Sequence, residues 1–310
     1  MNFKKLIVFS LAVGFIGLTG CKKSDSDASP AAPLPSWKQG QVIKDEKGWF
    51  ELEVGDIPLV ISVPHGGTIQ LDRLPNRDNC EDAVTVLDSY TVPLAEAIKK
   101  EFAQRYNLKP TVLITHLSRK HVDQNRELEE SFCEEHPELF DAWHWYHDHL
   151  DSAVRYAVAE HGESLFIDLH AHGHSVQRLE LGYGLTIAEI GRVYSGLDLD
   201  ELMAKSTLAN YKNVHGDVDL RELMIGPEAF GTLMHARDVP SVPSEQDPYL
   251  MSTDDYFNGG YNSRYFTSED YPKTYGWQIE VNSTARNTPE RQEHFASAFA
   301  ESIVQLLKLQ

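Results

Sequence analysis

Residues 59–67 read Leu-Val-Ile-Ser-Val-Pro-His-Gly-Gly, an apolar run that ends in a proline, a histidine and two glycines. We expect a strand over residues 59–63, because a near-continuous apolar run of this length is typical of a strand buried on both faces of a sheet. A second such run covers residues 165–169. Three histidines follow it directly, His170, His172 and His174, in the stretch 166–174 (FIDLHAHGH). Because sites in open α/β sheets gather at the carboxyl ends of strands, both strand ends are candidate functional positions.

Working outward from these two runs, short apolar strands alternate with longer helical patterns, which indicates an α/β fold. The other expected strands are residues 49–54, 111–116, 179–185 and 277–281. Helices are expected after Pro93, after Pro137, over residues 198–211 with Asp198 as N-cap, and after Thr288. Residues 226–275 are rich in Gly, Pro, Asn, Ser and Tyr, which predicts an irregular, site-forming region.

The composition excludes several classes of protein. The chain has 310 residues, of which 41% are hydrophobic and 24% charged, as in ordinary globular proteins. Its 28 Lys and Arg against 47 Asp and Glu give a formal charge of −19, so nucleic acid is not expected as a partner. With 3 cysteines the chain is not a disulfide scaffold, and pairing of Cys80 with Cys133 stays open.

The N-terminus has the pattern of an export signal. Lys4 and Lys5 precede an apolar run over residues 6–18, which is too short to span a membrane comfortably, and Leu-Thr-Gly-Cys follows, ending at Cys21. This looks like a bacterial lipoprotein signal with Cys21 as the lipidated residue, and a plain signal peptide is the alternative. We therefore expect a signal peptide over residues 1–20, a flexible tether over 21–36 and one catalytic domain over 37–310, anchored by lipid in the bacterial cell envelope, at the outer membrane if there are two.

The strand-end histidines favour a metal site over a loop of merely hydrogen-bonded histidines. His65 and His170 are the first candidate ligands, because neutral imidazoles with an open fourth position are usual zinc ligands. A carboxylate would complete the set, and Asp88, Glu81 and Asp82 compete for that role. Asp168 is expected to orient one of the imidazoles.

Two further segments carry candidate chemistry. Glu280 lies in the apolar run 277–281, where a carboxylate is costly unless it is paired or functional, so it is either a general base or half of an ion pair with Arg286. Residues 118–126 (SRKHVDQNR) form a basic cluster after an expected strand. Arg119 and Arg126 there predict an anionic substrate, unless they form surface salt bridges.

Taken in order, these motifs resemble the N-formylglutamate amidohydrolase family. They are Pro-His-Gly-Gly, Asp-x-x-Thr, Ser-Arg-x-x-x-Asp-x-Asn-Arg, Asp-Leu-His-x-His-Gly-His and Gln-Ile-Glu-x-Asn-x-x-x-Arg, spread over roughly residues 58–305. Residues 178–183 and 256–261 add to the likeness. The resemblance implies a three-layer α/β/α sandwich on a mixed sheet, of the phosphorylase/hydrolase-like type related to zinc carboxypeptidases.

The resemblance also implies roles for individual residues. One zinc ion per chain would be held by His65, Asp88 and His170, and Glu280 would be the general base. Arg126 would stabilise the oxyanion. Contacts with the substrate are expected from Arg119, Asn125, Arg126, His172, Arg178 and Arg286.

The function expected from this reasoning is zinc-dependent hydrolysis of the amide bond of an N-acyl (N-formyl) amino acid or short anionic peptide by metal-activated water. The first alternative is an envelope metallocarboxypeptidase or a peptidase that trims peptidoglycan. A non-enzyme alternative is a lipoprotein that binds an anionic ligand or zinc in the same pocket. The sequence leaves the oligomeric state undetermined.

Overall fold

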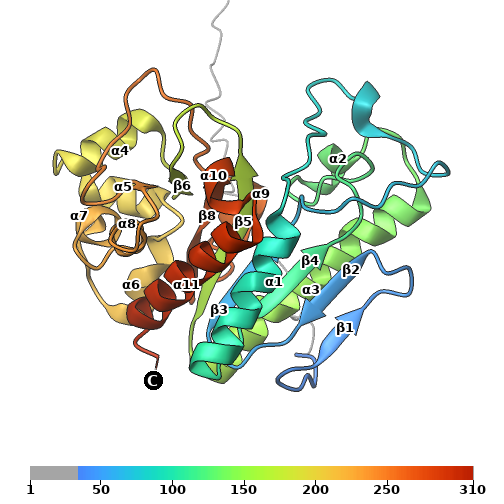
Figure 1. The fold of residues 1–310 in the computed structure, drawn as a ribbon, viewed down its shortest axis with the longest axis horizontal. Coiled ribbons are helices and arrows are strands. Elements are labelled where there is room, and N and C mark those ends of the chain that lie inside the picture. Colours follow the sequence, from blue (N-terminus) through green and yellow to red (C-terminus); the bar gives the residue numbers. More distant parts are fainter. Residues whose placement is uncertain (1–33, 310) are drawn as a thin grey trace, which may run out of the picture. The chain divides into compact units, whose positions relative to one another are not determined.

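A computed structural model describes residues 34–309 of the chain (Figure 1). The predicted signal peptide, Cys21 and most of the predicted tether fall in residues 1–33 and lie outside the described residues. Among residues 34–309, no helix combines the length and apolar character that crossing a membrane requires.

The described chain is built on one mixed sheet with strand order β1-β2-β4-β3-β5-β8-β6-β7. Its centre, β4-β3-β5-β8, is parallel, whereas β2 pairs antiparallel with β4 and β6 pairs antiparallel with β8. The strands are β1 Val42–Lys44, β2 Phe50–Glu53, β3 Leu59–Val63, β4 Thr111–Thr115, β5 Ser164–His172, β6 Leu179–Gly182, β7 Ser241–Val242 and β8 Thr274–Asn282.

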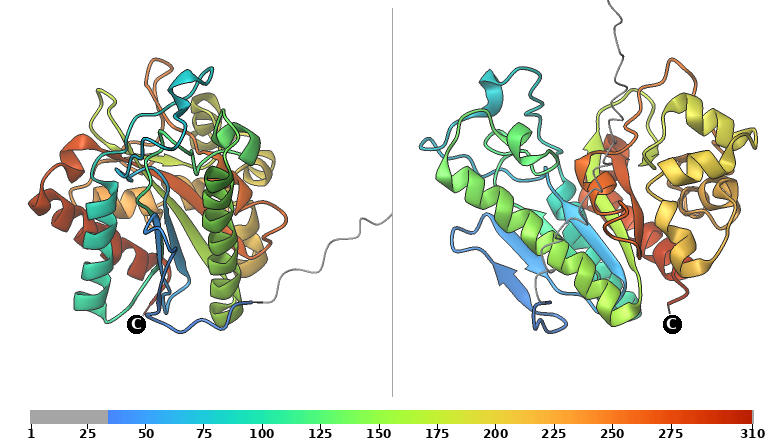
Figure 2. Two further views of the ribbon diagram at one scale, coloured as in Figure 1. Left: turned by 90° about the vertical axis from the view of Figure 1, so that its right-hand side faces the viewer. Right: turned by 180° about the vertical axis from the view of Figure 1, so that it is seen from behind.

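Helices cover both faces of the sheet, which gives three layers. Helices α1 (Thr91–Glu101) and α11 (Pro289–Leu306) pack side by side on one face, and α3 (Pro137–His161) runs along the other (Figure 2). The short α9 (Tyr261–Tyr265) lies beside α3. The α/β fold with a mixed sheet and flanking helices is therefore confirmed.

The remaining helices are short. Five of them gather near β6 and follow the chain from yellow to orange in Figure 1: α4 Ile187–Tyr194, α5 Leu199–Lys205, α6 Lys212–His215, α7 Leu220–Ile225 and α8 Phe230–His235. Helices α2 (Leu128–Ser131) and α10 (Ser283–Arg286) lie in the segments after β4 and β8.

Alternation along the central strands separates the two faces chemically. In β5, Ile167 and Leu169 point into the apolar core beneath α1 and α11. Asp168 and His170 are equally buried but point to the opposite face, since successive side chains of a strand alternate. The α3 face thus changes from apolar to polar toward the carboxyl ends of the strands, and that polar end holds the candidate site.

The sequence located the central strands well and the edges poorly. The expected strand 59–63 matches β3, while β5 and β8 extend beyond the runs 165–169 and 277–281 into polar residues. The edge strands β1 and β7 were not expected, because strands of three and two residues carry no usable pattern.

The predicted helix over residues 198–211 is wrong in extent. Helix α5 ends at Lys205, because Ser206 is extended, and a separate turn covers residues 209–211. Asp198 precedes the helix but has a positive φ of 54° and makes no capping bond. Its carboxylate instead accepts a hydrogen bond from Arg192 Nε at 3.0 Å.

The open question about the cysteines is answered by a disulfide between Cys80 and Cys133, whose Cα atoms are 5.5 Å apart. It joins the long segment between β3 and α1 to the segment before α3. The bridge restrains the segment that carries Asp88.

The close pairing of β5 with β8 generates a stability prediction. A Cβ at Gly276 would lie 1.8 Å from the carbonyl oxygen of Phe166, its partner in β5. We expect Gly276→Ala to lower the free energy of unfolding by about 3 kcal/mol or more, because backbone in a sheet cannot yield like a side chain.

Gly191→Ala is the matched control, since a Cβ there meets no atom within 4 Å and the residue lies in α4. It should gain up to about 1 kcal/mol from helix propensity. Urea unfolding of both variants measures the difference, and similar midpoints would contradict the prediction.

A second stability prediction concerns His147 on α3, which is stacked on Trp143 with ring centroids 3.9 Å apart. Burial lowers the pKa of His147 to about 4. Between about pH 6.5 and pH 4 the unfolded chain binds a proton that the folded chain excludes, so stability falls as pH falls, by about 3 kcal/mol over that window. His147→Gln should remove this part of the pH dependence of urea unfolding. Above pH 7 the free energy of unfolding should depend on pH in the same way in both proteins. The same pH dependence in both proteins below pH 6 would refute the assignment of this effect to His147.

Candidate functional site

The candidate site forms where the carboxyl ends of β3, β5 and β8 meet. His65 follows β3 after Pro64, and His170 lies near the end of β5. Glu280 of β8 is the register partner of His170 on one side and of Glu180 in β6 on the other. Three strands therefore present His170, Glu280 and Glu180 as one row across the α3 face of the sheet.

The glycines after His65 bring chain segments together. A Cβ on Gly66 would lie 2.4 Å from Thr91 Oγ1 at the start of α1, and one on Gly67 would lie 2.3 Å from the carbonyl oxygen of Leu117. The missing Cβ atoms thus let the start of α1 and the segment after β4 approach the chain next to His65. As a result the Asp88 amide donates to the carbonyl of His65 at 3.2 Å.

Three donor atoms converge at this edge. Nδ1 of His65 lies 3.1 Å from Nδ1 of His170, and Asp88 Oδ2 lies 3.0 Å from His170 Nδ1 and 3.5 Å from His65 Nδ1. Donor atoms that share a tetrahedral zinc ion are about 3.3 Å apart, given bonds of about 2.0–2.1 Å. Of the competing carboxylates, Glu81 and Asp82 are exposed, so the geometry brings only Asp88 to the histidines.

The outer nitrogen of each imidazole faces a carboxylate. His65 Nε2 lies 2.6 Å from Asp123 Oδ1, and His170 Nε2 lies 2.9 Å from Asp168 Oδ2. Each Nε2 then carries the proton that its carboxylate accepts, and each Nδ1 is left as a lone-pair donor. Carboxylate-held imidazoles of this kind are typical of metal ligands.

This donor set fits a divalent cation. Two bare Nδ1 atoms and a carboxylate oxygen within 3.5 Å repel one another unless a proton or a metal ion lies among them. Burial alone would lower the pKa of His170, but Asp168 and Asp88 raise it well above its ordinary value. Burial alone would raise the pKa of Asp88, but hydrogen bonds with His170 and His65 lower it. The cluster thus attracts positive charge strongly, and His65, Asp88 and His170 would hold the metal.

Glu280 lies in this same charged environment and is 4% exposed. Burial, followed by the negative charges of Asp88 and Glu180, raises its pKa to about 8, against an opposing effect of His170. The side-chain Nε2 of Gln278 donates to Glu280 Oε1 at 2.8 Å. A buried carboxyl group with a pKa near neutrality is suited to accept and release a proton.

The basic cluster of residues 118–126 is folded around Asp123. Arg119 Nη2 donates to Asp123 Oδ2 at 2.9 Å and Arg77 Nη1 donates to it at 3.3 Å, while Arg119 also lies 3.8 Å from Asp88. Burial alone would raise the pKa of Asp123, but His65 and the two arginines hold it well below its ordinary value. Arg119 is therefore engaged by Asp123, which holds His65, and by Asp88, the candidate carboxylate ligand.

Asn125 and Arg126 continue from this cluster toward the site. The Asn125 Nδ2 atom lies 3.1 Å from His170 Nε2. The Oδ1 atom of Asn125 accepts a hydrogen bond from the backbone N–H of Asn262 at 2.8 Å. The side chain of Asn125 is thus buried against His170, a candidate metal ligand. Arg126 donates to the carbonyl of Asn125 at 2.8 Å and forms no ion pair with any described residue.

The other two candidate arginines have different surroundings. Arg178 donates to Asp247 and to Asp254, both at 2.8 Å, so its charge is already matched by two carboxylates. Arg286 is buried and donates to the carbonyls of Ser89, His172 and Val281. Among the described residues it has no ion pair, although the charges of Asp88 and Glu280 act on it.

Sequence reasoning missed three members of this edge. Asp123 and Arg77 were not assigned roles, since their pairing joins segments 46 residues apart. Glu180 was not flagged either, although it lies in the apolar run Leu-Glu-Leu of β6. Like Glu280, Glu180 is a carboxylate in an apolar strand, and this pattern alone marks it as paired or functional.

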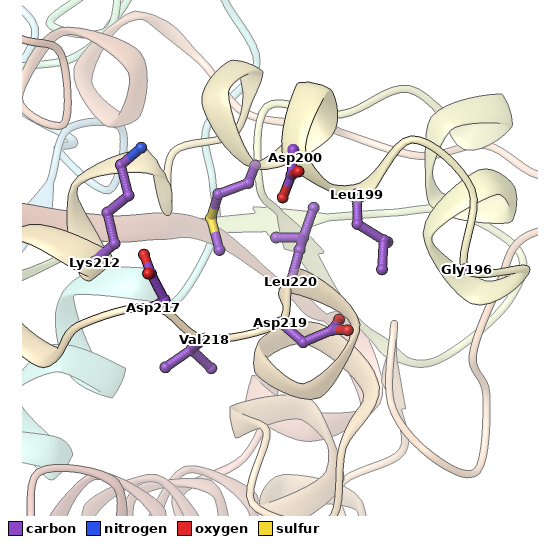
Figure 3. Close-up of a pocket in the computed structure, with 9 residues that line it drawn as sticks. Gly196, Leu199, Asp200, Lys212, Asp217, Val218, Asp219 and Leu220 are labelled. Carbon is purple, nitrogen blue, oxygen red and sulfur yellow. The ribbon is translucent and has the colours of Figure 1, made fainter.

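A separate cavity of about 690 Å³ lies among α5, α6 and α7 (Figure 3). Its charged lining residues, Asp200, Lys212, Asp217 and Asp219, are exposed to solvent. Lys212 and Gly196 mark its opposite ends in the close-up. None of the candidate metal ligands, nor Glu280, lines this cavity.

No family model matches the chain, and no curated protein matches it. Among solved structures, the chain is similar to an N-formylglutamate amidohydrolase from Ralstonia eutropha JMP134, with 13% identity, a TM-score of 0.49 and coverage of 84% of this chain and 97% of that one. It is also similar to a putative carboxypeptidase from Burkholderia mallei ATCC 23344, with 13% identity and a TM-score of 0.40. The match covers 89% of this chain and 65% of that one. The chain is similar, too, to a metallo-carboxypeptidase from Pseudomonas aeruginosa, with 11% identity and a TM-score of 0.38. That match covers 88% of this chain and 66% of the other.

The carboxylate behind His170 generates a prediction on metal binding. Asp168→Asn keeps the shape of the side chain and an oxygen for His170 Nε2, but removes the charge that makes the imidazole a better ligand. We expect zinc affinity to fall about 10–100-fold. Competition between the protein and a chromogenic chelator measures this, with the exposed Asp141→Asn as control. Unchanged affinity in Asp168→Asn would remove Asp168 from the metal site.

Proposed function

We propose that the chain is a metal-dependent hydrolase that cleaves the amide bond of a small anionic N-acyl amino acid or short peptide. The observation that carries the proposal is the convergence of His65, Asp88 and His170, each imidazole held by a carboxylate, next to the buried Glu280. Such a ligand set beside a buried carboxyl group is the arrangement that activates water for attack on a carbonyl.

The chemistry of the donors supports zinc as the metal. Two imidazole nitrogens and one carboxylate oxygen are the protein ligands that catalytic zinc favours, with a further position open to water. When bound, zinc supplies a water molecule acidified to near neutral pH and polarises the substrate carbonyl. Asp123 and Asp168 keep the two imidazoles in the orientation and tautomer that the metal requires.

Glu280 is the proposed general base. Gln278 holds its Oε1, and no described residue donates to Oε2, which is left for the attacking water. A cation at His65, Asp88 and His170 would lower the pKa of Glu280, because an opposite charge favours the ionised carboxylate. Glu280 then takes the proton of the water molecule as it attacks, and passes it to the leaving amine.

The arginines support a substrate that carries a carboxylate. Arg119 and Arg178 are already paired with acidic side chains, which leaves Arg126 and Arg286 as the guanidinium groups without an ion pair at this edge of the described chain. Arg286 is fixed by backbone carbonyls beside Asp88 and Glu280. We assign the substrate carboxylate to Nη2 of Arg286, whose Nε and Nη1 are held by backbone carbonyls, and the developing oxyanion to Arg126. A guanidinium donates charge-assisted hydrogen bonds to either group.

The order of the five sequence motifs supports an N-formylglutamate amidohydrolase-like activity in particular. The signal-like N-terminus ending at Cys21 supports a lipid-anchored protein of the bacterial cell envelope. The disulfide between Cys80 and Cys133 also supports an oxidising compartment outside the cytosol.

The test of the reaction class is a pooled amide screen with mass-spectrometric detection. The purified chain is stripped of metal, reloaded with zinc and incubated with N-formyl and N-acetyl amino acids and with dipeptides. We expect amine release from acidic N-acyl amino acids, abolished by chelator and restored by zinc. Release from peptides alone would replace the proposal by a metallocarboxypeptidase. No turnover in any pool, despite bound zinc, would leave a zinc-binding or anion-binding protein.

The role of Glu280 generates a separate prediction. Glu280→Gln should lower kcat at least about 100-fold, because the variant cannot accept a proton. Its zinc content should equal that of wild type, since Glu280 is outside the ligand group. Elemental analysis of His65→Ala and His170→Ala provides the contrast, and each should contain one zinc ion fewer than wild type, because the ion at His65, Asp88 and His170 is lost. Full activity of Glu280→Gln would exclude Glu280 as the base.

A further inference from the structure

A second group of donor atoms lies at the end of β5, next to the first. It consists of His172, His174 and Glu180, whose ligand atoms all lie within 4.8 Å of one another. We propose that these three residues bind a second divalent cation, with zinc as the class of ion that their donor set favours. The proposal goes beyond the proposed function and does not depend on its outcome.

The hydrogen bonds around the group turn its donor atoms toward one another. His172 Nε2 donates to the carbonyl of Arg178 at 2.8 Å, so its Nδ1 carries the lone pair, and that Nδ1 lies 3.8 Å from Glu180 Oε1. His174 Nδ1 lies 2.8 Å from the same oxygen. The other oxygen, Glu180 Oε2, accepts from the Phe257 amide at 3.1 Å. The group thus repeats the pattern of His65 and His170, with the far nitrogen of one imidazole held by an acceptor.

Charge at this position also favours a cation. Glu180 is 1% exposed and is the cross-strand partner of Glu280, which is also buried. Like charges directly opposite on neighbouring strands destabilise a sheet. In the described part of the chain no lysine or arginine pairs with Glu180, and Arg178 is held by Asp247 and Asp254. A divalent ion at the second group would supply the compensating charge.

The second ion would be a separate centre and not half of a bridged pair. His170 and His172 are two residues apart on the same face of β5, so their Cα atoms are about 7 Å apart. The two groups share no residue, so neither Asp88 nor Glu180 is a ligand common to both. The second ion would therefore fix the segment between β5 and β6, and the segment of Phe257, beside the substrate site.

Two existing hydrogen bonds have to open for the ion to enter. His174 Nδ1 and Glu180 Oε1 are hydrogen-bonded at 2.8 Å, and the ion would replace that contact. The His174 amide donates to His172 Nδ1 at 3.1 Å, and that nitrogen would become a ligand. The residue between them is Gly173, around whose Cβ position nothing lies within 4 Å. The chain there has room to turn the amide away and to bring the His174 ring over the ion.

The test is zinc stoichiometry of the full chain by equilibrium dialysis after chelator treatment. We expect two zinc ions per wild-type chain. His174→Ala and Glu180→Gln should each bind one, with the second site at least 100-fold weaker, whereas the control His161→Ala should bind two. Circular dichroism establishes that each variant is folded, and His174 is suited to the test because its side chain lies partly exposed in a loop.

The design separates this proposal from the proposed function. His65→Ala should also bind one zinc, retained at the second group, and the double variant His65→Ala/His174→Ala should bind none. One zinc in wild type that His65→Ala loses and His174→Ala keeps would overturn the second site and leave the first intact. One zinc that only His174→Ala loses would support the second group and overturn the first. Two zinc ions in a folded His174→Ala variant would also refute the proposal.

Discussion

The structure depends on the burial of uncompensated negative charge at one edge of the sheet. The buried acidic residues of the described chain are Asp88, Asp123, Asp168, Glu180 and Glu280, and its buried arginines are Arg77, Arg119 and Arg286. Burying a carboxylate without a partner costs several kcal/mol, so the segments that supply partners must converge on the same place. Arg77 comes from the segment between β3 and α1, Arg119 from the segment after β4, and Arg286 from α10. The three arginines do not balance the five acids, and this excess of negative charge favours a cation at the edge.

The same constraint explains which parts of the fold the sequence predicted. Strands β3, β5 and β8 are signalled by apolar runs, because they are buried by helices on both faces. Their ends were missed where apolar residues give way to the charged edge, as at His170 and His172 in β5. The broken helix after Lys205 and the short edge strands depend on tertiary contacts, which no local pattern contains.

The sequence predicted which residues form the candidate site better than it predicted the contacts among them. His65, His170 and Glu280 could be found because each is a polar residue in or directly after an apolar strand. The choice of Asp88 over Glu81 and Asp82 required the fold, since all three precede α1 and only the approach of that helix to His65 separates them. The arginines were the least predictable. Whether a guanidinium is available to a ligand depends on which carboxylates lie beside it in space, and sequence distance does not show this.

Alternation along the strands keeps the stability of the protein apart from its chemistry. In β5 and β8 the residues on one face, such as Leu169 and Ile279, build the apolar core beneath α1 and α11. Their immediate neighbours, His170 and Glu280, face the other way and form the charged row. A substitution on the apolar face therefore acts on the site only through the position of the backbone. A substitution on the charged face changes the electrostatic balance directly, while leaving the larger core in place. The sheet can thus hold an energetically unfavourable cluster of carboxylates at its edge, because the apolar face of the same strands fixes their spacing.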